Sequence, residues 1–336
     1  MSGRRGNLKA VDVIIHSKQG NQYFQSKDGI IAMIRALRPT DVVALLLFLS
    51  RPPIEEARAR DRLSYGGWQL PLLFHLLKCS IFPDDERRFS VSVERGLIHG
   101  LACLRSLSGP EAWEVKRLLL APGHEGCCLN LLERIGRAVD KLGAERIFLR
   151  LDSGSPAVDM AKGAGFCRHL TEHLYRLGGR RRRGQPEPAI PLRRCFSEDD
   201  YRLFRLYSAA VPLQVRTVEG MTLQEWSRGR ERGKVREWAY EDKGEIKAWL
   251  RVWSEGMTGQ FDIVTSLGGD GLGSLVDCAL SLLSGREPVY CVVPEYQQGL
   301  MALLEERGFR WEAEYTCLNR QLAARIREPQ LVPLQA

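Results

Sequence analysis

The stretch WEVKRLLLAPGHEGCCLNLL, residues 113–132, predicts a strand, a turn and a helix in immediate succession. Residues 113–120 are apolar and continuous enough for a buried strand. Residues 121–123 (APG) end it, because proline has no N–H for a strand ladder and glycine permits a sharp turn. From Cys127 apolar residues recur at spacings of three and four, which predicts a helix that ends at Gly143. The N–H groups at the start of this helix could bind an anion such as a pyrophosphate.

This stretch resembles the coenzyme-binding motif of the GNAT acetyltransferase superfamily. In that family a strand ending V-x-P is followed by R-G-x-G-x-G, whose amides bind the pyrophosphate of acetyl-coenzyme A. Here residues 120–122 (LAP) match V-x-P, whereas residues 125–130 (EGCCLN) replace the glycine loop and keep one of its glycines. The resemblance implies acetyl-coenzyme A as co-substrate. It predicts coenzyme contacts from the backbone of Leu118 and Leu120 and from the loop residues Gly126, Cys127, Cys128, Leu129 and Asn130.

The order of expected elements indicates a mixed α/β fold (α+β, with a mixed sheet) that occurs twice. A strand at 31–37, a helix at 42–49, a helical region at 67–79 and a hairpin at 89–104 precede the opening stretch. Further strands at 146–151 and 166–177 flank a helix at 156–162. The hairpin VERGLIHG (93–100) is echoed by EDKGEIKA (241–248), and the pair Gly165-Phe166 by Gly308-Phe309. We therefore predict two tandem GNAT-like acyltransferase domains.

The predicted domain boundaries follow the composition of the chain. Residues 1–29 are expected to be an N-terminal tail, 30–178 the first domain and 190–327 the second domain, followed by a tail at 328–336. Residues 179–189 contain glycine, proline and a run of arginines, which is typical of a linker rather than of a packed element.

A second glycine loop follows the strand expected at 261–267. Gly269, Gly271 and Gly273 have the G-x-G-x-G spacing, between a strand and a helix. No V-x-P precedes them, and Asp270 adds a negative charge. The first domain thus keeps V-x-P and the second keeps the glycines, so either could bind the coenzyme. An unliganded turn is the alternative interpretation of the second loop.

Acetyl transfer to an amine needs a base for the amine and donors for the thioester oxygen. The resemblance implies that Glu114, on the strand before the first loop, is the base, and a surface carboxylate at the strand end is the alternative interpretation. The tyrosine that often serves as acid in the family is replaced by Ala161 and Leu304 in the two domains. His124 lies close in sequence to Cys127, so a reactive thiolate of Cys127 is a further possible nucleophile. The alternative is that Cys127 and Cys128 only pack the start of the helix.

Composition limits the class of protein without selecting a partner. The net charge is +8, from 49 basic and 41 acidic residues, which favours acidic partners in general. Nine cysteines without a C-x-x-C pair indicate neither a disulfide framework nor a zinc site. The longest apolar run, 42–49, is too short to span a membrane, and a cytoplasmic location is expected.

Three functional hypotheses follow. The first is an N-acyltransferase that moves an acetyl or other acyl group from acyl-coenzyme A to a small-molecule or peptide amine. The second is a catalytically inactive tandem GNAT protein that senses a ligand or binds a protein, since the first loop has lost its glycines. The third is nucleic-acid binding through Arg180–Arg183, for which the sequence gives a weak signal because no aromatic residues separate the arginines. The sequence identifies no metal site, acceptor or oligomeric state.

Overall fold

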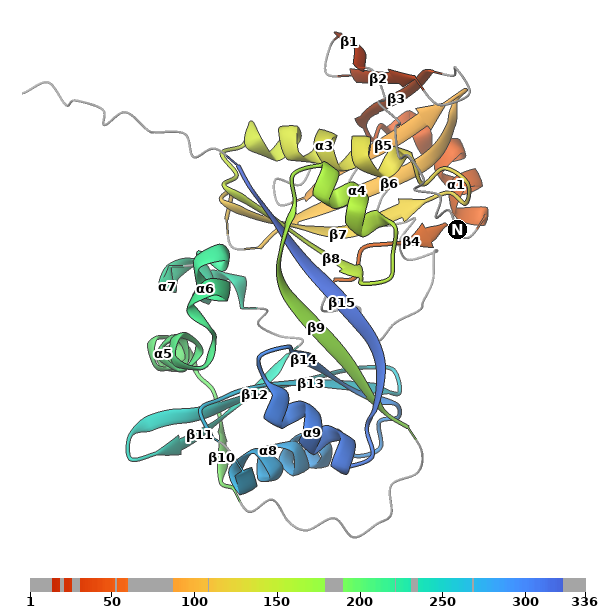
Figure 1. Ribbon diagram of the computed structural model, residues 1–336. Helices are drawn as coiled ribbons and strands as arrows, with labels where there is room; N and C mark the ends of the chain where they lie inside the picture. Colours follow the sequence, from red (N-terminus) through yellow and green to blue (C-terminus); the bar gives the residue numbers. More distant parts are fainter. Residues whose placement is uncertain are drawn as a thin grey trace, which may run out of the picture.

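The computed structural model describes residues 14–18, 21–25, 31–51, 53–59, 87–107, 109–178, 190–220, 222–230, 235–267 and 269–322. Fifteen strands in these ranges form one sheet (Figure 1). Residues 31–178 (the first half) and 190–322 (the second half) run through a similar order of elements. Among the described helices, none is long and apolar enough to cross a membrane.

In the described residues, the first half contains strands and helices that the sequence predicts and one strand that it does not. They are β3 (Ile31–Ala36), α1 (Val42–Ser50), β4 (Ile54–Glu55), β5 (Arg87–Glu94), β6 (Leu97–Ser106), β7 (Ala112–Leu120), α3 (Cys127–Asp140), β8 (Arg146–Asp152), α4 (Ala157–Gly163) and β9 (Cys167–Leu177). The short strand β4 was not expected. The helical region expected at 67–79 lies outside the described residues. Two strands, β1 (Ile14–Lys18) and β2 (Asn21–Gln25), lie within the expected tail and extend the sheet beyond β3.

Among the described residues, the second half follows a similar order but has two further helices, α6 and α7, and no counterpart of β4. It contains β10 (Leu192–Arg194), α5 (Asp200–Ala210), α6 (Leu213–Glu219), α7 (Leu223–Gly229), β11 (Arg236–Asp242), β12 (Glu245–Glu255), β13 (Thr258–Thr265), α8 (Gly269–Leu282), β14 (Val289–Pro294), α9 (Gln298–Glu306) and β15 (Arg310–Gln321). Strands β10 to β13 form an antiparallel meander, and β13 and β14 are parallel across α8, as β7 and β8 are across α3. This mixed pairing confirms the predicted fold class.

The last strand of each half is exchanged with the other half. The sheet order β7-β8-β15-β9-β14-β13 places β15 between β8 and β9, and β9 next to β14. Figure 1 shows β9 and β15 running together from one half to the other. Leu318 of β15 therefore packs in the core of the first half, and Tyr175 of β9 in the core of the second. The sequence did not predict this exchange, and it makes the sheet continuous through both halves.

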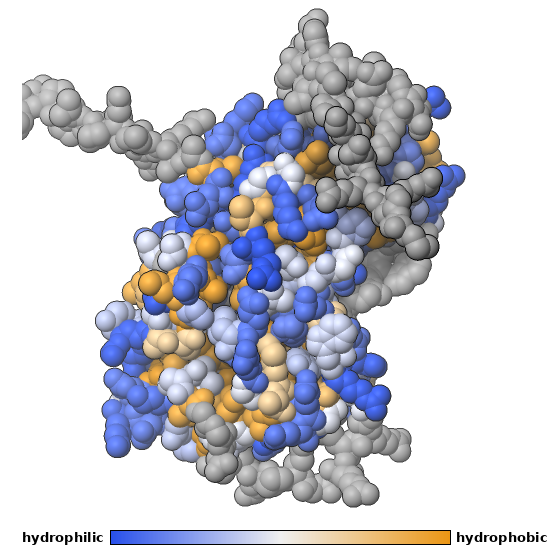
Figure 2. Space-filling view, viewed as in Figure 1, coloured by the Kyte–Doolittle hydropathy of each residue, from blue (hydrophilic) through white to orange (hydrophobic). Residues whose placement is uncertain are grey.

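Each half has its own apolar core between the sheet and its helices. In the first half, Trp113 of β7 and Leu131 and Leu132 of α3 are 1% exposed or less. In the second half, Phe261 of β13 and Leu275 of α8 are fully buried. Figure 2 shows a largely hydrophilic outer surface over α3 and α4, as expected for helices whose apolar side faces a sheet.

The start of each half is held by the same ion pair. Arg35 donates two hydrogen bonds of 2.6 Å to the carboxylate of Asp41, and Arg193 donates two of 2.7 Å to Asp199. Both aspartates also accept a backbone N–H, from Arg38 and Phe196 respectively. Such bidentate, charge-assisted bonds fix the turn that follows the first strand of each half.

Candidate functional site

Both halves contain a pair of parallel strands that separate after a few residues. Pairing of β7 with β8 covers Ala112–Glu114 of β7, and pairing of β13 with β14 covers Gly259–Phe261 of β13. Beyond these residues β7 continues to Leu120 and β13 continues to Thr265. Over this length neither strand is paired with its parallel neighbour, β8 or β14. Each half therefore has an opening between two parallel strands, next to the N-terminus of a helix.

In the first half the chain itself fills this opening. Strand β4 pairs antiparallel with β7, joining Ile54 to Leu120, and the N–H of Glu56 donates to the carbonyl of Leu118 at 2.8 Å. On the other side, Ala57 forms a bridge with Leu151 of β8. The segment 54–59 thus lies between the separated strands.

Side chains hold this segment in place. Ala57 and Ala59 are each 2% exposed. The carboxylate of Glu55 forms an ion pair of 3.1 Å with Arg117 of β7, and that of Glu56 accepts a hydrogen bond from Ser155. The backbone N–H of Arg58 donates to the carbonyl of Arg150 at 2.8 Å. Residues 54–59 are therefore packed into the fold by buried side chains and by hydrogen bonds to both β7 and β8.

The edge of β7 on which contacts from Leu118 and Leu120 were predicted is the edge that β4 covers. The carbonyl of Leu118 is used by Glu56, and Leu120 stands opposite Ile54. A pantetheine chain on this edge would have to displace residues 54–59. The predicted coenzyme contacts of these two leucines therefore stay a prediction that requires such a displacement.

The loop between β7 and α3 contains a carboxylate, that of Glu125. The N–H of Gly123, a residue with φ +81°, donates to the carboxylate of Glu125 at 3.0 Å. Hydrogen bonds from the backbone of Glu125 itself and of Gly123 hold the pKa of this carboxyl below its usual value. A carboxylate already sits where an incoming phosphate would need N–H donors, so it competes with and repels a phosphate there.

The predicted loop residues differ in their access to solvent. Gly126 is exposed at the start of α3, Cys127 and Leu129 are half-buried, and Cys128 and Asn130 are buried. Burial raises the pKa of the Cys127 thiol to about 12 and also raises that of Cys128. These thiols stay protonated at neutral pH, which favours packing over the hypothesis of a thiolate nucleophile.

Glu114, the predicted base, lies at the opposite end of β7 from this loop. Its carboxylate pairs with the Arg105 guanidinium of the neighbouring strand at 2.9 Å. The second half has the same arrangement, in which Asp262 of β13 pairs with Arg251 of β12 at 2.7 Å. An arginine-paired carboxylate recurs at this position of both halves. The role of Glu114 as a base stays a prediction.

In the second half the corresponding opening adjoins a pocket of about 880 Å³. Its lining includes Thr265 at the end of β13 and Leu267 after it, Gly273 and Asp277 of α8, and Leu303 of α9 with Arg307 just after that helix. This volume is within the range of ligand sites for small molecules and cofactors. The pocket runs along the side of the first turns of α8, from Leu272 to Asp277. The N–H groups at the start of a helix favour an anion.

The predicted glycines of the second loop begin α8. Gly269 is the first residue of the helix and Gly273 lines the pocket. A Cβ atom at Gly271 would lie 3.3 Å from the side chain of Leu267, and one at Gly273 would lie 2.8 Å from the guanidinium of Arg307. The spacing of Gly271 and Gly273 therefore serves close packing of α8 against its surroundings, and Gly273 also borders the pocket.

Two pocket residues were missed by the sequence interpretation. The side-chain amide of Gln297 donates to the carbonyl of Ile263 at 3.1 Å, on the edge of β13 that faces the opening. Arg307 binds the carboxylate of Asp277 through two hydrogen bonds of 3.0 Å and joins α8 to α9. The polar run EYQQG after the strand at 289–294 was the available signal for Gln297.

Comparison with known structures gives the class of fold. The chain is 14% identical to a GCN5-related N-acetyltransferase from Sphaerobacter thermophilus, with a TM-score of 0.56 over 86% of this chain and 95% of that one. It is 13% identical to a putative acetyltransferase from Pyrococcus horikoshii, with a TM-score of 0.54 over 92% and 94% of the two chains.

A tandem arrangement is also found among these structures. A tandem GNAT protein from the clavulanic acid biosynthesis pathway is 15% identical to this chain, with a TM-score of 0.52 over 86% of this chain and 98% of that one. No protein-family model and no curated protein matches the sequence. The likeness is one of fold: the chain has the GNAT fold, as the sequence predicted.

Proposed function

We propose that this protein is an N-acyltransferase that binds an acyl-coenzyme A in the second half and transfers its acyl group to an amine. The GNAT fold supports acyl transfer as the general activity. Acetyl-coenzyme A is the donor to test first. The acceptor is an amine of a small molecule or a peptide.

The observation that carries the proposal is the difference between the two openings. Residues 54–59 and the carboxylate of Glu125 occupy the first opening and its loop. The second opening adjoins a pocket of about 880 Å³ along the first turns of a 14-residue helix. A coenzyme can enter the second site without displacing a buried strand, and its phosphates would meet the positive end of α8.

Gln297 gives the second opening a polar group. Its amide bridges to Ile263 across the gap that β13 and β14 leave. Pantetheine contains amides that can replace this bond with backbone bonds to β13, so Gln297 would turn aside on binding. The free energy of the lost bond, about 1 kcal/mol, is small against the binding of a coenzyme.

Two matched glycine variants test which half binds the coenzyme. Gly299 lines the pocket near the start of α9, and Gly126 precedes α3 in the first half. A Cβ atom at either position meets nothing within 4 Å, so both sites accept a side chain without strain on the fold. We expect Gly299→Trp to weaken acetyl-coenzyme A binding at least ~10-fold in calorimetric titration, or about 1.4 kcal/mol, and Gly126→Trp to leave it unchanged.

Opposite behaviour of the two variants would assign the coenzyme to the first half. Absence of binding of acetyl-, propionyl- and free coenzyme A by the wild-type protein at millimolar concentration would refute the proposal. Thiol release with a panel of amines then tests turnover. Saturable binding without turnover of any amine would instead favour the ligand-sensing alternative.

A further inference from the structure

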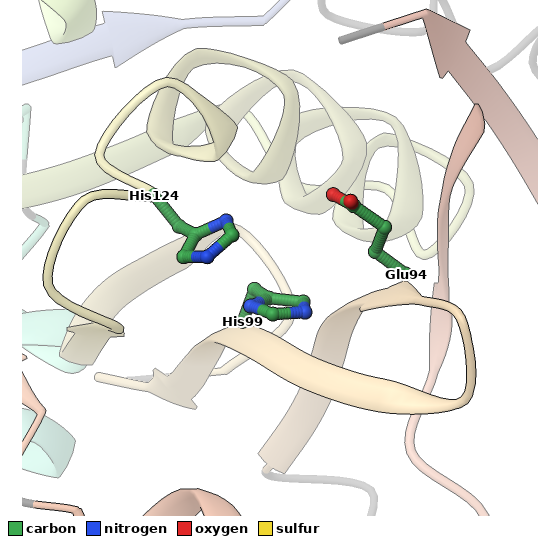
Figure 3. A group of neighbouring side chains, drawn as sticks. All are labelled: Glu94, His99 and His124. Carbon is green, nitrogen blue, oxygen red and sulfur yellow. The ribbon is translucent and has the colours of Figure 1, made fainter. Parts of the chain in front are cut away.

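Three potential metal ligands meet beside the first loop. Glu94 ends β5, His99 lies in β6 and His124 lies in the turn between β7 and α3. One donor atom from each of them lies within 4.8 Å of the other two, and all three residues are half-buried (Figure 3). Figure 3 shows the His99 and His124 rings next to each other, with the carboxylate of Glu94 pointing toward them from the other side.

The backbone positions Glu94 and His99 through a tight hairpin. Arg95 and Gly96 form its two-residue turn with φ +50° and +80°, the conformation that suits the twist of a hairpin. The register pairs Val93 with Ile98 but Ser92 with Gly100, so His99 is the extra residue of a β-bulge. Bulges redirect a side chain, and this one brings the His99 ring to the end of β5, where Glu94 lies.

A hydrogen-bonded turn fixes His124 against the same strand. The N–H of Ala121 donates to the carbonyl of His99 at 2.8 Å, and the N–H of His124 donates to the carbonyl of Ala121 at 3.0 Å. The centroids of the His99 and His124 rings are 3.9 Å apart. The two imidazoles therefore come from segments that backbone hydrogen bonds tie together, and their spacing does not depend on side-chain packing alone.

Two other potential metal ligands lie nearby, but each already has a different contact. The carboxylate of Glu125 is held by the N–H of Gly123. The Cys127 sulfur lies 3.9 Å from the carbonyl of His99 and is packed beneath the loop. Two nitrogens and one carboxylate oxygen match the ligand preference of Zn²⁺, whereas Mg²⁺ and Ca²⁺ prefer oxygen ligands throughout.

We propose that Glu94, His99 and His124 bind a divalent transition-metal ion, with Zn²⁺ as the best match to the ligand set. The two rings now lie with their centroids 3.9 Å apart and tilted by 35°, so bonds of about 2.0–2.2 Å would require them to rotate until one nitrogen of each points to the ion. The ion would join the β5–β6 hairpin to the turn before α3. The turn that resembles a phosphate loop would then serve to hold a cation.

Metal titration of the full chain, without a histidine tag and after treatment with a chelator, tests this site. We expect one Zn²⁺ per chain by calorimetry, and a rise in the unfolding temperature on addition of Zn²⁺. The variants His124→Gln and Glu94→Gln should each bind Zn²⁺ at least about 100-fold more weakly, because even outer-shell changes cost 10–100-fold. His173→Gln is the matched control, since His173 is also half-buried and lies 3.8 Å from a glutamate, Glu314.

Co²⁺ provides the spectroscopic readout of the ligand set. Absorption bands typical of nitrogen and oxygen ligation, without a thiolate-to-cobalt charge-transfer band, would support the proposal. A thiolate band would overturn it by placing a cysteine in the site. It would also be overturned by the absence of binding, by unchanged binding in both site variants, or by an equal loss in His173→Gln. Circular dichroism of each variant separates loss of the site from loss of the fold.

Discussion

The backbone N–H of Glu56 donates a hydrogen bond of 2.8 Å to the carbonyl oxygen of Leu118. This bond joins a strand that the sequence did not predict to the edge of β7 on which coenzyme contacts were predicted. The two halves of the chain therefore share a fold and differ at the opening between their parallel strands. Under the proposed function, only the second half binds the coenzyme.

Hydrogen exchange tests whether residues 54–59 remain in the opening. We expect the amides of Glu56 and Arg58 to exchange at least about 100-fold more slowly than in an unstructured peptide, because both are hydrogen-bonded beside buried residues. Acetyl-coenzyme A should leave their rates unchanged and should slow exchange at residues 265–273. Faster exchange of Glu56 and Arg58 on addition of the coenzyme would show that the ligand displaces the strand.

A substitution in residues 54–59 measures how much the packing of this segment contributes to the free energy of unfolding. Ala57 is 2% exposed, so Ala57→Asp buries a carboxyl group and should lower the free energy of unfolding by about 2–4 kcal/mol in urea titration. Ala209→Asp, at an exposed position in the last turn of α5, is the control and should lower it by only about 1 kcal/mol, from helix propensity and the helix dipole. Equal effects of the two changes would contradict a packed strand at 54–59.

The repeated ion pairs predict a loss of stability in acid. Burial by itself would raise the pKa of Asp41, but hydrogen bonds from Arg35 and from the N–H of Arg38 hold it below the usual 3.8. The hydrogen bond from Arg193 likewise lowers the pKa of Asp199. Since the folded state favours the ionised carboxyls, their stabilisation is present above the unfolded-state pKa and is lost as the pH falls through the lower folded-state values.

Asparagine variants of the two aspartates measure this contribution. Asp41→Asn should lower the free energy of unfolding at pH 7 by about 3 kcal/mol, because both side chains of the pair are buried. Asp199→Asn should cost less, since the Arg193 side chain is 36% exposed and solvent screens the pair. Urea titrations below pH 5 should show a shallower decline for each variant than for the wild type. Parallel declines would argue against a role of these carboxyls in acid unfolding.

The order of strands and helices could be predicted because each element depends on a local pattern of apolar and polar residues. The alternation at 89–93 and the helical spacing from Cys127 onward need no knowledge of the rest of the chain. The glycines at 269–273 were predicted to form a loop between a strand and a helix, whereas α8 already begins at Gly269. Periodicity of two or of 3.6 residues identifies an element and its buried face.

Local patterns do not determine which strands pair with each other in the sheet. The residues of β9 predict a buried strand equally well beside β8 or beside β14, so the exchange with β15 could not be seen. Strand β4 has two residues and follows Pro52 and Pro53, too short for any period. Glu94, His99 and His124 are separated by a hairpin, a strand and a turn, and only the fold brings them together.

The strand exchange predicts that the first half does not fold alone. In the fragment 30–178, β8 would lose β15, and β9 would lose both β15 and β14. Unpaired strand edges of this length promote association. We expect the fragment to elute as oligomers or aggregates in size-exclusion chromatography, and co-expression with residues 179–336 to restore a 1:1 complex. A monomeric fragment with a cooperative unfolding transition would show that β9 can return to the first half.

Thiol labelling tests the assignment of Cys127 and Cys128 to packing. Because burial raises the pKa of Cys127 to about 12, only ~10⁻⁴ of this thiol is ionised at pH 8, and its reaction with iodoacetamide should be slow. Cys167 is exposed at the start of β9 and should react first. Residue-by-residue mass spectrometry gives the rates, and a Cys79→Ser background removes the cysteine that lies outside the described residues. Cys167→Ser should abolish the fast phase. Labelling of Cys127 at the rate of Cys167 would instead support the alternative hypothesis of a reactive thiolate at the start of α3.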